Sequence, residues 1–197
     1  MAALLPVSSK TLPIQVQSGQ IEEFLFSCGL QSPSFDITSP SDLPLALHTA
    51  RAKLLEAADE LVLLVQGPLQ SLTSLVGYSH NARNSIHAIV RFDLATTIPI
   101  DSTSTFEEVA TARGLDSGDT TRILRHAMTY RVFSEKSPGV VAHTATSRLL
   151  VENPSLRGWI TNTLDELLPA ASRMVDAMER WPGSQEPNHT GWNLAHA

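Results

Sequence analysis

The chain has 197 residues, of which 42% are hydrophobic and 17% are charged. This composition is typical of a folded protein with a sizeable core, and the length fits one domain, or one domain with an extended arm. The 14 Lys and Arg residues and 20 Asp and Glu residues give a net charge of −6, which disfavours nonspecific binding to nucleic acid or to an anionic membrane surface.

The sequence also indicates a compartment. A single cysteine, Cys28, excludes an intramolecular disulfide bond and fits a reducing environment. The first seven residues form a short, uncharged stretch that is followed by polar residues, unlike a signal peptide. No apolar run approaches the roughly 20 residues that span a bilayer. We therefore expect a soluble, cytoplasmic protein without a membrane partner.

Residues 1–44 are predicted to be a partly ordered arm. They are rich in Ser, Pro and Gln, and only the apolar segment 21–26 favours a helix. The next segment predicts a strong helix, because Ser41 and Asp42 can cap it and apolar residues recur at spacings of three and four up to Val65. Gly67 and Pro68 are expected to end it. Two further helices are predicted, over about 69–78 and about 81–96.

A helix–turn–helix–wing pattern follows. Thr105 and Glu108 have the spacing of a capping box, and Gly114 is a helix stop. Asp116 begins a second helix, after which residues 132–134 and 140–143 are short β candidates joined by a Ser-Pro-Gly turn. The pattern predicts a two-stranded hairpin beside a small helical core.

The C-terminal helices begin at Asn153-Pro154, an N-cap followed by a first-turn proline. An apolar stripe from Leu156 to Leu167 is expected to face the core, with a break or kink at Pro169. Residues 180–194 are polar, contain Pro and Gly, and hold two tryptophans. This composition indicates an ordered linker that leads into a further domain.

The segments 122–129, 140–150 and 180–194 resemble fungal natural-product O-methyltransferases of the dimeric, plant-COMT-like kind. The resemblance covers roughly residues 45–194, which correspond to the family's N-terminal helical and winged-helix domain and its linker. It implies a mostly α fold, with a helical dimerisation bundle, a winged-helix-like three-helix core and a small β-hairpin wing. It also implies an arm over 1–44, this domain over 45–180, a linker remnant over 181–197, and a homodimer through about 45–95 and 150–180.

The pattern for the family's S-adenosylmethionine domain is missing. Its cofactor turn needs closely spaced glycines after a strand, whereas the nearest pair here is Gly114 and Gly118, neither of which follows such a strand. The histidine that the family uses as the methyl-transfer base also belongs to that domain. We expect no cofactor, and because no zinc-ligand spacing occurs, no metal.

Candidate site residues come from the seven histidines and their neighbours. His87 and Arg91, one helical turn apart, are the candidate catalytic pair, since in an apolar setting they could together polarise a carbonyl or enol. The family pattern has Gln at the His87 position, and Asp93 is also atypical; a surface histidine is the alternative. His126 and His143 also suit structural roles, in which the ring bonds a carbonyl. The candidate substrate-binding residues are Phe92, His126, Tyr130, His189 and Trp192.

Four functions remain open from the sequence. The first is a cofactor-independent cyclase or isomerase acting on a small apolar, polyketide-like intermediate. The second is a non-catalytic dimerisation module that pairs with itself, with a full-length methyltransferase or with a regulator. The third is DNA binding through Arg122, Arg125 and Arg131, which the negative net charge disfavours. The fourth is a fragment of a longer O-methyltransferase.

Overall fold

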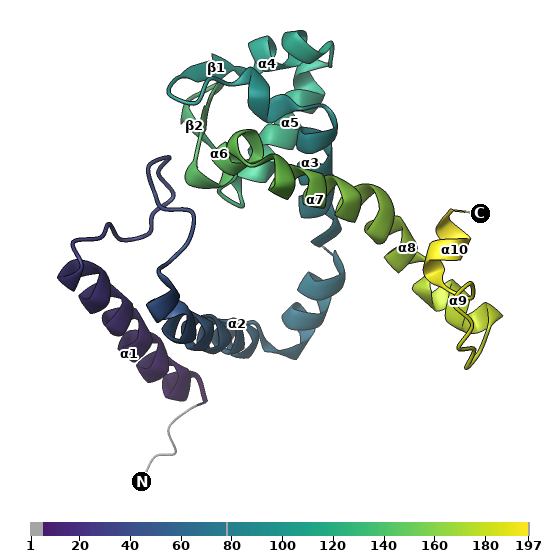
Figure 1. Ribbon diagram of the computed structural model, residues 1–197, viewed down its shortest axis with the longest axis horizontal. Helices are drawn as coiled ribbons and strands as arrows, with labels where there is room; N and C mark the ends of the chain where they lie inside the picture. Colours follow the sequence, from purple (N-terminus) through teal and green to yellow (C-terminus); the bar gives the residue numbers. More distant parts are fainter. Residues whose placement is uncertain (1–5, 78, 197) are drawn as a thin grey trace. The chain divides into compact units, whose positions relative to one another are not determined.

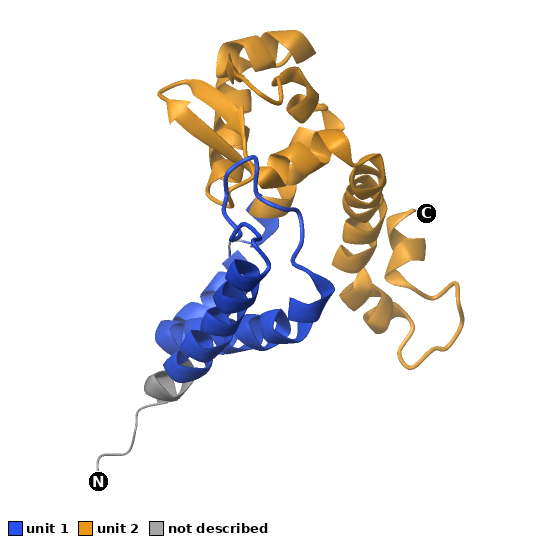
Figure 2. Ribbon diagram, turned by 60° about the vertical axis from the view of Figure 1, so that its left-hand side comes forward, with its two compact units in different colours: residues 1–81 blue, residues 82–197 orange. Residues whose placement is uncertain are grey.

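The computed structural model describes residues 6–77 and 79–196. It is 68% helical with one small three-stranded antiparallel sheet, which confirms the mostly α fold (Figure 1). Packing divides the chain into two compact units, residues 1–81 and 82–197 (Figure 2). The domain boundaries expected from the sequence, at residues 44 and 180, stay a prediction.

Unit 1 contains α1 (Pro6–Ser27), the 3-10 turn η1 (Leu45–Leu47) and α2 (His48–Gly77). Helix α1 packs along α2 (Figures 1 and 2). Ile21, Leu25 and Leu47 are buried between these elements. The helix expected over 21–26 is therefore the last part of a much longer one, whose earlier turns lack an apolar stripe that would have revealed them.

The predicted break at Gly67-Pro68 is confirmed as a kink. Gly67 has a φ of 67° and a ψ of 174°, a conformation that favours glycine and interrupts the helical ladder of α2. The segment predicted over 69–78 continues α2 beyond this kink, and residue 78 lies outside the described residues.

Apolar side chains of α2 are exposed on both sides of the kink. Leu69, Leu75 and Val76 are 77%, 73% and 72% exposed, and the same holds for Leu55, Val62, Leu63, Leu64, Val65 and Leu72. By length and composition alone, the helical stretch Leu45–Arg91 passes the test for a membrane-spanning helix. One such stretch is weak evidence for a membrane protein.

Unit 2 begins within α3 (Ser79–Arg91) and continues through η2 (Leu94–Thr97), β1 (Thr103–Thr105), α4 (Phe106–Arg113), α5 (Ser117–Met128), β2 (Phe133–Ser137) and β3 (Val140–His143). The sheet order is β1-β3-β2, with Thr103 opposite Ala142 and Phe133 opposite His143. The hairpin of β2 and β3 confirms the predicted wing, and β1 is a third strand that the sequence did not reveal.

We call residues 103–143, from β1 to β3, the wing region. Local end signals explain the helices of this region. Thr105 and Glu108 form the predicted capping box, and Gly114 ends α4 with a φ of 65°. Asp116 caps α5 through the amide of Asp119. Several side chains of these elements are fully buried in one core, including those of Ile89, Leu94, Val109, Leu124, Phe133 and Val141.

The helix predicted over about 81–96 ends earlier, at Arg91. Asp93 takes a left-handed conformation with a φ of 52°. Its carboxylate accepts hydrogen bonds from Arg113 and Arg157, at 2.8 Å and 3.1 Å. These long-range contacts stabilise a backbone conformation that a non-glycine residue rarely adopts.

The remaining elements are α6 (Ala145–Glu152), α7 (Pro154–Asn162), the π-helical turn η3 (Thr163–Leu167), α8 (Leu168–Ser172), α9 (Met174–Arg180) and α10 (Gly191–Ala195). The Asn153-Pro154 start is confirmed. Helices α6 and α10 were not predicted, and α10 packs against α8 and α9 (Figure 1). The apolar stripe does not face the core throughout, since Trp159 and Leu167 are exposed.

Candidate functional site

The candidate catalytic pair, His87 and Arg91, meets at a carboxylate that the sequence did not reveal. Both side chains belong to α3 and lie one turn apart. His87 Nε2 is 2.6 Å from Asp165 Oδ1, and Arg91 Nη1 is 3.4 Å from Asp165 Oδ2. Asp165 thereby orients the imidazole of His87 through one ring nitrogen. Among the described residues, Nδ1 of His87 has no hydrogen-bond partner.

Asp165 comes from η3, the π-helical turn between α7 and α8. Such turns are rare and frequently occur at functional sites. The exposed fractions of the His87, Arg91 and Asp165 side chains are 38%, 64% and 25%. The cluster is thus accessible to solvent, and the apolar setting expected for His87 is not found. The sequence did not predict Asp165 as the partner of His87, because 78 residues separate the two.

Two of the predicted substrate-binding residues meet at the end of α5, His126 within the helix and Tyr130 in the turn that follows it. His126 Nδ1 lies 2.8 Å from the hydroxyl of Ser85, and its ring packs edge-on against Tyr130 with a centroid distance of 5.6 Å. The bond to Ser85 supports the structural alternative for His126. Phe92, at the end of α3, is 43% exposed.

The other two predicted substrate-binding residues make local contacts in the C-terminal segment. His189 stacks on Trp181 with ring centroids 4.5 Å apart. Trp192 stacks on His196, whose Nε2 lies 2.9 Å from Glu166. Adjacent carboxylates of η3 therefore bind different partners: Asp165 binds α3, and Glu166 binds the end of the chain's C-terminal segment.

A groove of about 320 Å³ is lined by residues of α3, α7 and η3 and by Tyr130 and Val132, and we call it the α3–α7 groove. Its polar lining residues are Arg83, Tyr130 and Thr163. The hydroxyl of Thr163 is shielded from solvent and has no hydrogen-bond partner among the described residues, an arrangement that costs about 1–3 kcal/mol. The apolar lining consists of Ala82, Ile86, Val132, Trp159, Ile160 and Leu164.

His143 has the structural role that its position in the wing suggested. Its Nε2 lies 3.1 Å from the carbonyl of Ile98 and its Nδ1 lies 2.9 Å from the hydroxyl of Ser147. Burial lowers the pKa of His143, while the backbone hydrogen bond to Ile98 acts in the opposite direction. A neutral ring therefore connects β3 to the start of α6.

Two of the three arginines considered for DNA contact are paired with carboxylates. Arg125 binds Glu135 through two hydrogen bonds, of 3.0 Å and 2.7 Å, and Arg122 binds Asp119. The bonds from Arg125 and from the amide of Gly139 lower the pKa of Glu135 to about 2. The Arg125–Glu135 pair thereby fastens the wing to α5.

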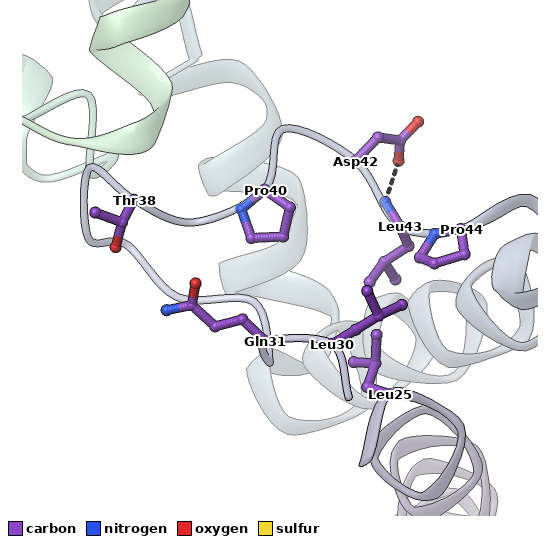
Figure 3. A pocket seen from close by; sticks show the side chains of 8 residues that line it. All are labelled: Leu25, Leu30, Gln31, Thr38, Pro40, Asp42, Leu43 and Pro44. Atoms are coloured by element: carbon purple, nitrogen blue, oxygen red, sulfur yellow. Dashed lines mark hydrogen bonds between the residues drawn. The ribbon is translucent and has the colours of Figure 1, made fainter. Parts of the chain in front are cut away.

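Unit 1 has a hollow of its own, of about 480 Å³, between the end of α1 and the loop that follows it. Figure 3 shows the side chains of Leu25, Leu30 and Leu43 close together at one side, and the Asp42 carboxylate bonded to the amide of Leu43. Among the described residues, no group of three or more His, Cys, Asp or Glu side chains is arranged to hold a metal ion.

The chain is similar in sequence to several fungal enzymes. It is 35% identical over 192 residues to the O-methyltransferase kk1A of Curvularia clavata, covering 96% of this chain and 46% of that protein. It is 32% identical to the O-methyltransferase aurJ of Gibberella zeae, with 99% and 43% covered. The chlorophenol O-methyltransferase of Trichoderma longibrachiatum is 30% identical, with 92% and 39% covered.

The chain is related to the fungal O-methyltransferases. It spans less than half the length of each of these three relatives. The fold agrees: a crystal structure of OxaC matches 95% of this chain and 44% of its own, with a TM-score of 0.70 and 17% identity. Another structure of that protein holds SAH and oxaline. No family model matches the chain.

Proposed function

We propose that this chain is the association module of an O-methyltransferase-like protein, and that it forms a homodimer through the apolar face of α2. The exposed leucines and valines of α2 carry this proposal. Exposed apolar side chains in such number mark interaction sites in soluble proteins, because covering them removes them from water. Met174, Val175 and Met178 of α9 are 57%, 66% and 64% exposed and are the second candidate contact.

The module itself is proposed to work without a cofactor. Its described sheet consists of three short antiparallel strands. The glycine-rich turn that binds a dinucleotide or a related cofactor joins a strand of a parallel sheet to a helix. We expect no saturable binding of S-adenosylmethionine in calorimetry, and micromolar affinity would contradict this.

A matched pair of charge substitutions tests the association proposal. Leu72→Glu places a carboxylate on the exposed apolar face of α2, where Leu72 is 63% exposed, and it should raise the dissociation constant of the dimer by about tenfold or more. Gln70→Glu adds the same charge two residues away, at another exposed position of α2, and should change the constant by less than about twofold. Equal self-association of both variants and the wild type would contradict the proposal.

The His87–Asp165 contact favours a second candidate function, a cofactor-independent isomerase or cyclase of fungal natural-product biosynthesis that acts on an apolar, polyketide-like intermediate. His87 would take a proton from the carbon next to a carbonyl, and Arg91 would stabilise the enolate oxygen. The protonated imidazole would return the proton to a second carbon. This isomerisation balances without a co-reactant.

Three substitutions test this second function in the producing fungus. His87→Gln and Arg91→Gln should abolish the isomerised product and lead to accumulation of its precursor. Asp165→Asn should reduce product formation less, because Asp165 positions the imidazole and does not touch the substrate. If all three variants are folded and the product profile is unchanged, the His87 cluster has no catalytic role.

A further inference from the structure

We propose that His196 and Glu166 form a proton-dependent contact that holds the C-terminal segment, residues 181–196, against η3. The contact forms when the His196 imidazole carries a hydrogen on both ring nitrogens, and it weakens when the ring loses one of them. The position of this segment, and with it the exposure of Trp192, then responds to pH. The proposal goes beyond both candidate functions, since it depends neither on self-association through α2 nor on a reaction at His87.

The two ring nitrogens of His196 both lie against oxygen atoms that accept hydrogen bonds. Nδ1 is 3.0 Å from the carbonyl oxygen of Trp192, and Nε2 is 2.9 Å from a carboxylate oxygen of Glu166. A backbone carbonyl cannot donate, so Nδ1 must carry a hydrogen. A neutral ring would then place the lone pair of Nε2 against the lone pairs of the ionised carboxylate. The contact therefore requires a second proton between His196 and Glu166.

The surroundings of the His196 ring suit both of its protonation states. The ring stacks on the indole of Trp192 with centroids 4.1 Å apart and an interplanar angle of 23°, and a cation gains energy from the face of an indole. The side chains of His196 and Glu166 are 30% and 41% exposed. Because neither group is buried, solvent can deliver the second proton and remove it again.

Glu166 is the one acidic side chain within ion-pair distance of His196 among the described residues. Helix α10 packs against α8 and α9 (Figure 1), and α8 has no charged side chain. The other titratable or charged groups of η3, of α9 with its N-cap and of the loop before α10 form no ion pair with His196 in the described part of the chain; they are Asp165, Arg173, Asp176, Glu179, Arg180, Glu186 and His189. Residue 197 lies outside the described residues.

Two other histidines of unit 2 make similar contacts without needing a second proton. Nε2 of His87 also meets a carboxylate, but its Nδ1 has no hydrogen-bond partner among the described residues. A neutral ring with its hydrogen on Nε2 therefore satisfies that contact. His189 stacks on an indole as His196 does, but its Nδ1 meets the hydroxyl of Ser184. Because a hydroxyl can donate or accept, either protonation state of His189 fits.

Hydrogen exchange of the α10 amides at about pH 5.5 and about pH 8 tests the proposal. Unperturbed histidine side chains titrate between these values, near pH 6.5. Each rate is compared with that of an unstructured chain at the same pH, which removes the intrinsic pH dependence of exchange. Protection of α10 in the wild-type chain should be about two- to fivefold higher at the lower pH, the range expected for a partly exposed ion pair. His143 acts in the opposite direction, since its contribution to stability declines as the pH falls.

Two variants assign the pH dependence to the contact. Glu166→Gln and His196→Gln should each remove it and leave α10 protected at about the level of the wild type at pH 8. The control Glu179→Gln, which removes an exposed carboxylate of α9, should retain it.

Three results would overturn the proposal. The first is a wild-type chain whose α10 is equally protected at the two pH values or unprotected at both. The second is a folded Glu166→Gln or His196→Gln chain that keeps the wild-type pH dependence. The third is loss of the dependence in Glu179→Gln as well, which would assign it to the overall charge of the segment.

Discussion

The wing region of unit 2 and the long helix of unit 1 place their leucines and valines differently. In the wing region Val109, Leu124 and Val141 are completely buried, each against partners from several elements of the same unit. Along α2, Leu69 and Leu75 are more than 70% exposed. The first set stabilises the fold within the chain. The second set does not, and in the proposed function it forms the surface through which two chains associate.

Truncating one leucine from each set should separate the two roles most strongly. Leu124→Ala leaves a cavity in the core of unit 2 and should lower the free energy of unfolding by about 2–5 kcal/mol. Leu75→Ala should change it by less than about 0.5 kcal/mol in the monomer. Denaturant unfolding at low protein concentration measures both changes. Similar losses of unfolding free energy in the two variants would show that the two leucines do not differ in their role.

A glycine pair tests how firmly the C-terminal segment is held on unit 2. A Cβ atom at Gly191 would overlap the carbonyl oxygen of Ala170, so Gly191→Ala should cost roughly 1–3 kcal/mol by overpacking. It should also expose α10 to hydrogen exchange. Gly158 in α7 has nothing within 4 Å of such an atom. Gly158→Ala should therefore stabilise α7 by about 0.5–1 kcal/mol. Unchanged exchange of α10 in Gly191→Ala would mean that this close approach is not required.

His143 should give the wing region a modest pH dependence. Because burial lowers its pKa in the folded state, the unfolded chain takes up the proton first as the pH falls below about 6.5. The free energy of unfolding should therefore decline between pH 7 and pH 5.5. In His143→Gln this decline should be smaller, and parallel pH profiles of the two proteins would show that His143 contributes nothing to it.

The elements with local end signals were predictable from the sequence. The capping box of Thr105 and Glu108, the stop at Gly114 and the start at Asn153-Pro154 depend on residues three or four positions apart, and all three are confirmed. Strand β1 is the polar tripeptide Thr-Ser-Thr and has no such signal. It is a strand because it pairs with β3, 35 to 39 residues later, from Thr103 opposite Ala142 to Thr105 opposite Val140. The left-handed Asp93 likewise depends on distant arginines.

The candidate site was predictable only in part, for the same reason. His87 and Arg91 share one face of a helix, so their proximity follows from spacing. Their partner Asp165 lies in a π-helical turn, whose extra residue has no sequence signal and changes which side chains face α3. Trp159, by contrast, has the spacing of a core residue but is exposed. Its exposure could not be predicted, because apolar periodicity does not distinguish a helix face in the core from an exposed apolar face.

Sedimentation equilibrium of the wild-type chain over about 1–100 μM tests the central claim most directly, since self-association through α2 must appear as an increase in mass. The account predicts a reversible increase from the chain mass of 21.4 kDa to twice that value, and in Leu72→Glu the same increase at about tenfold or more higher concentration. A wild-type chain that sediments with the mass of a single chain at every concentration would contradict it.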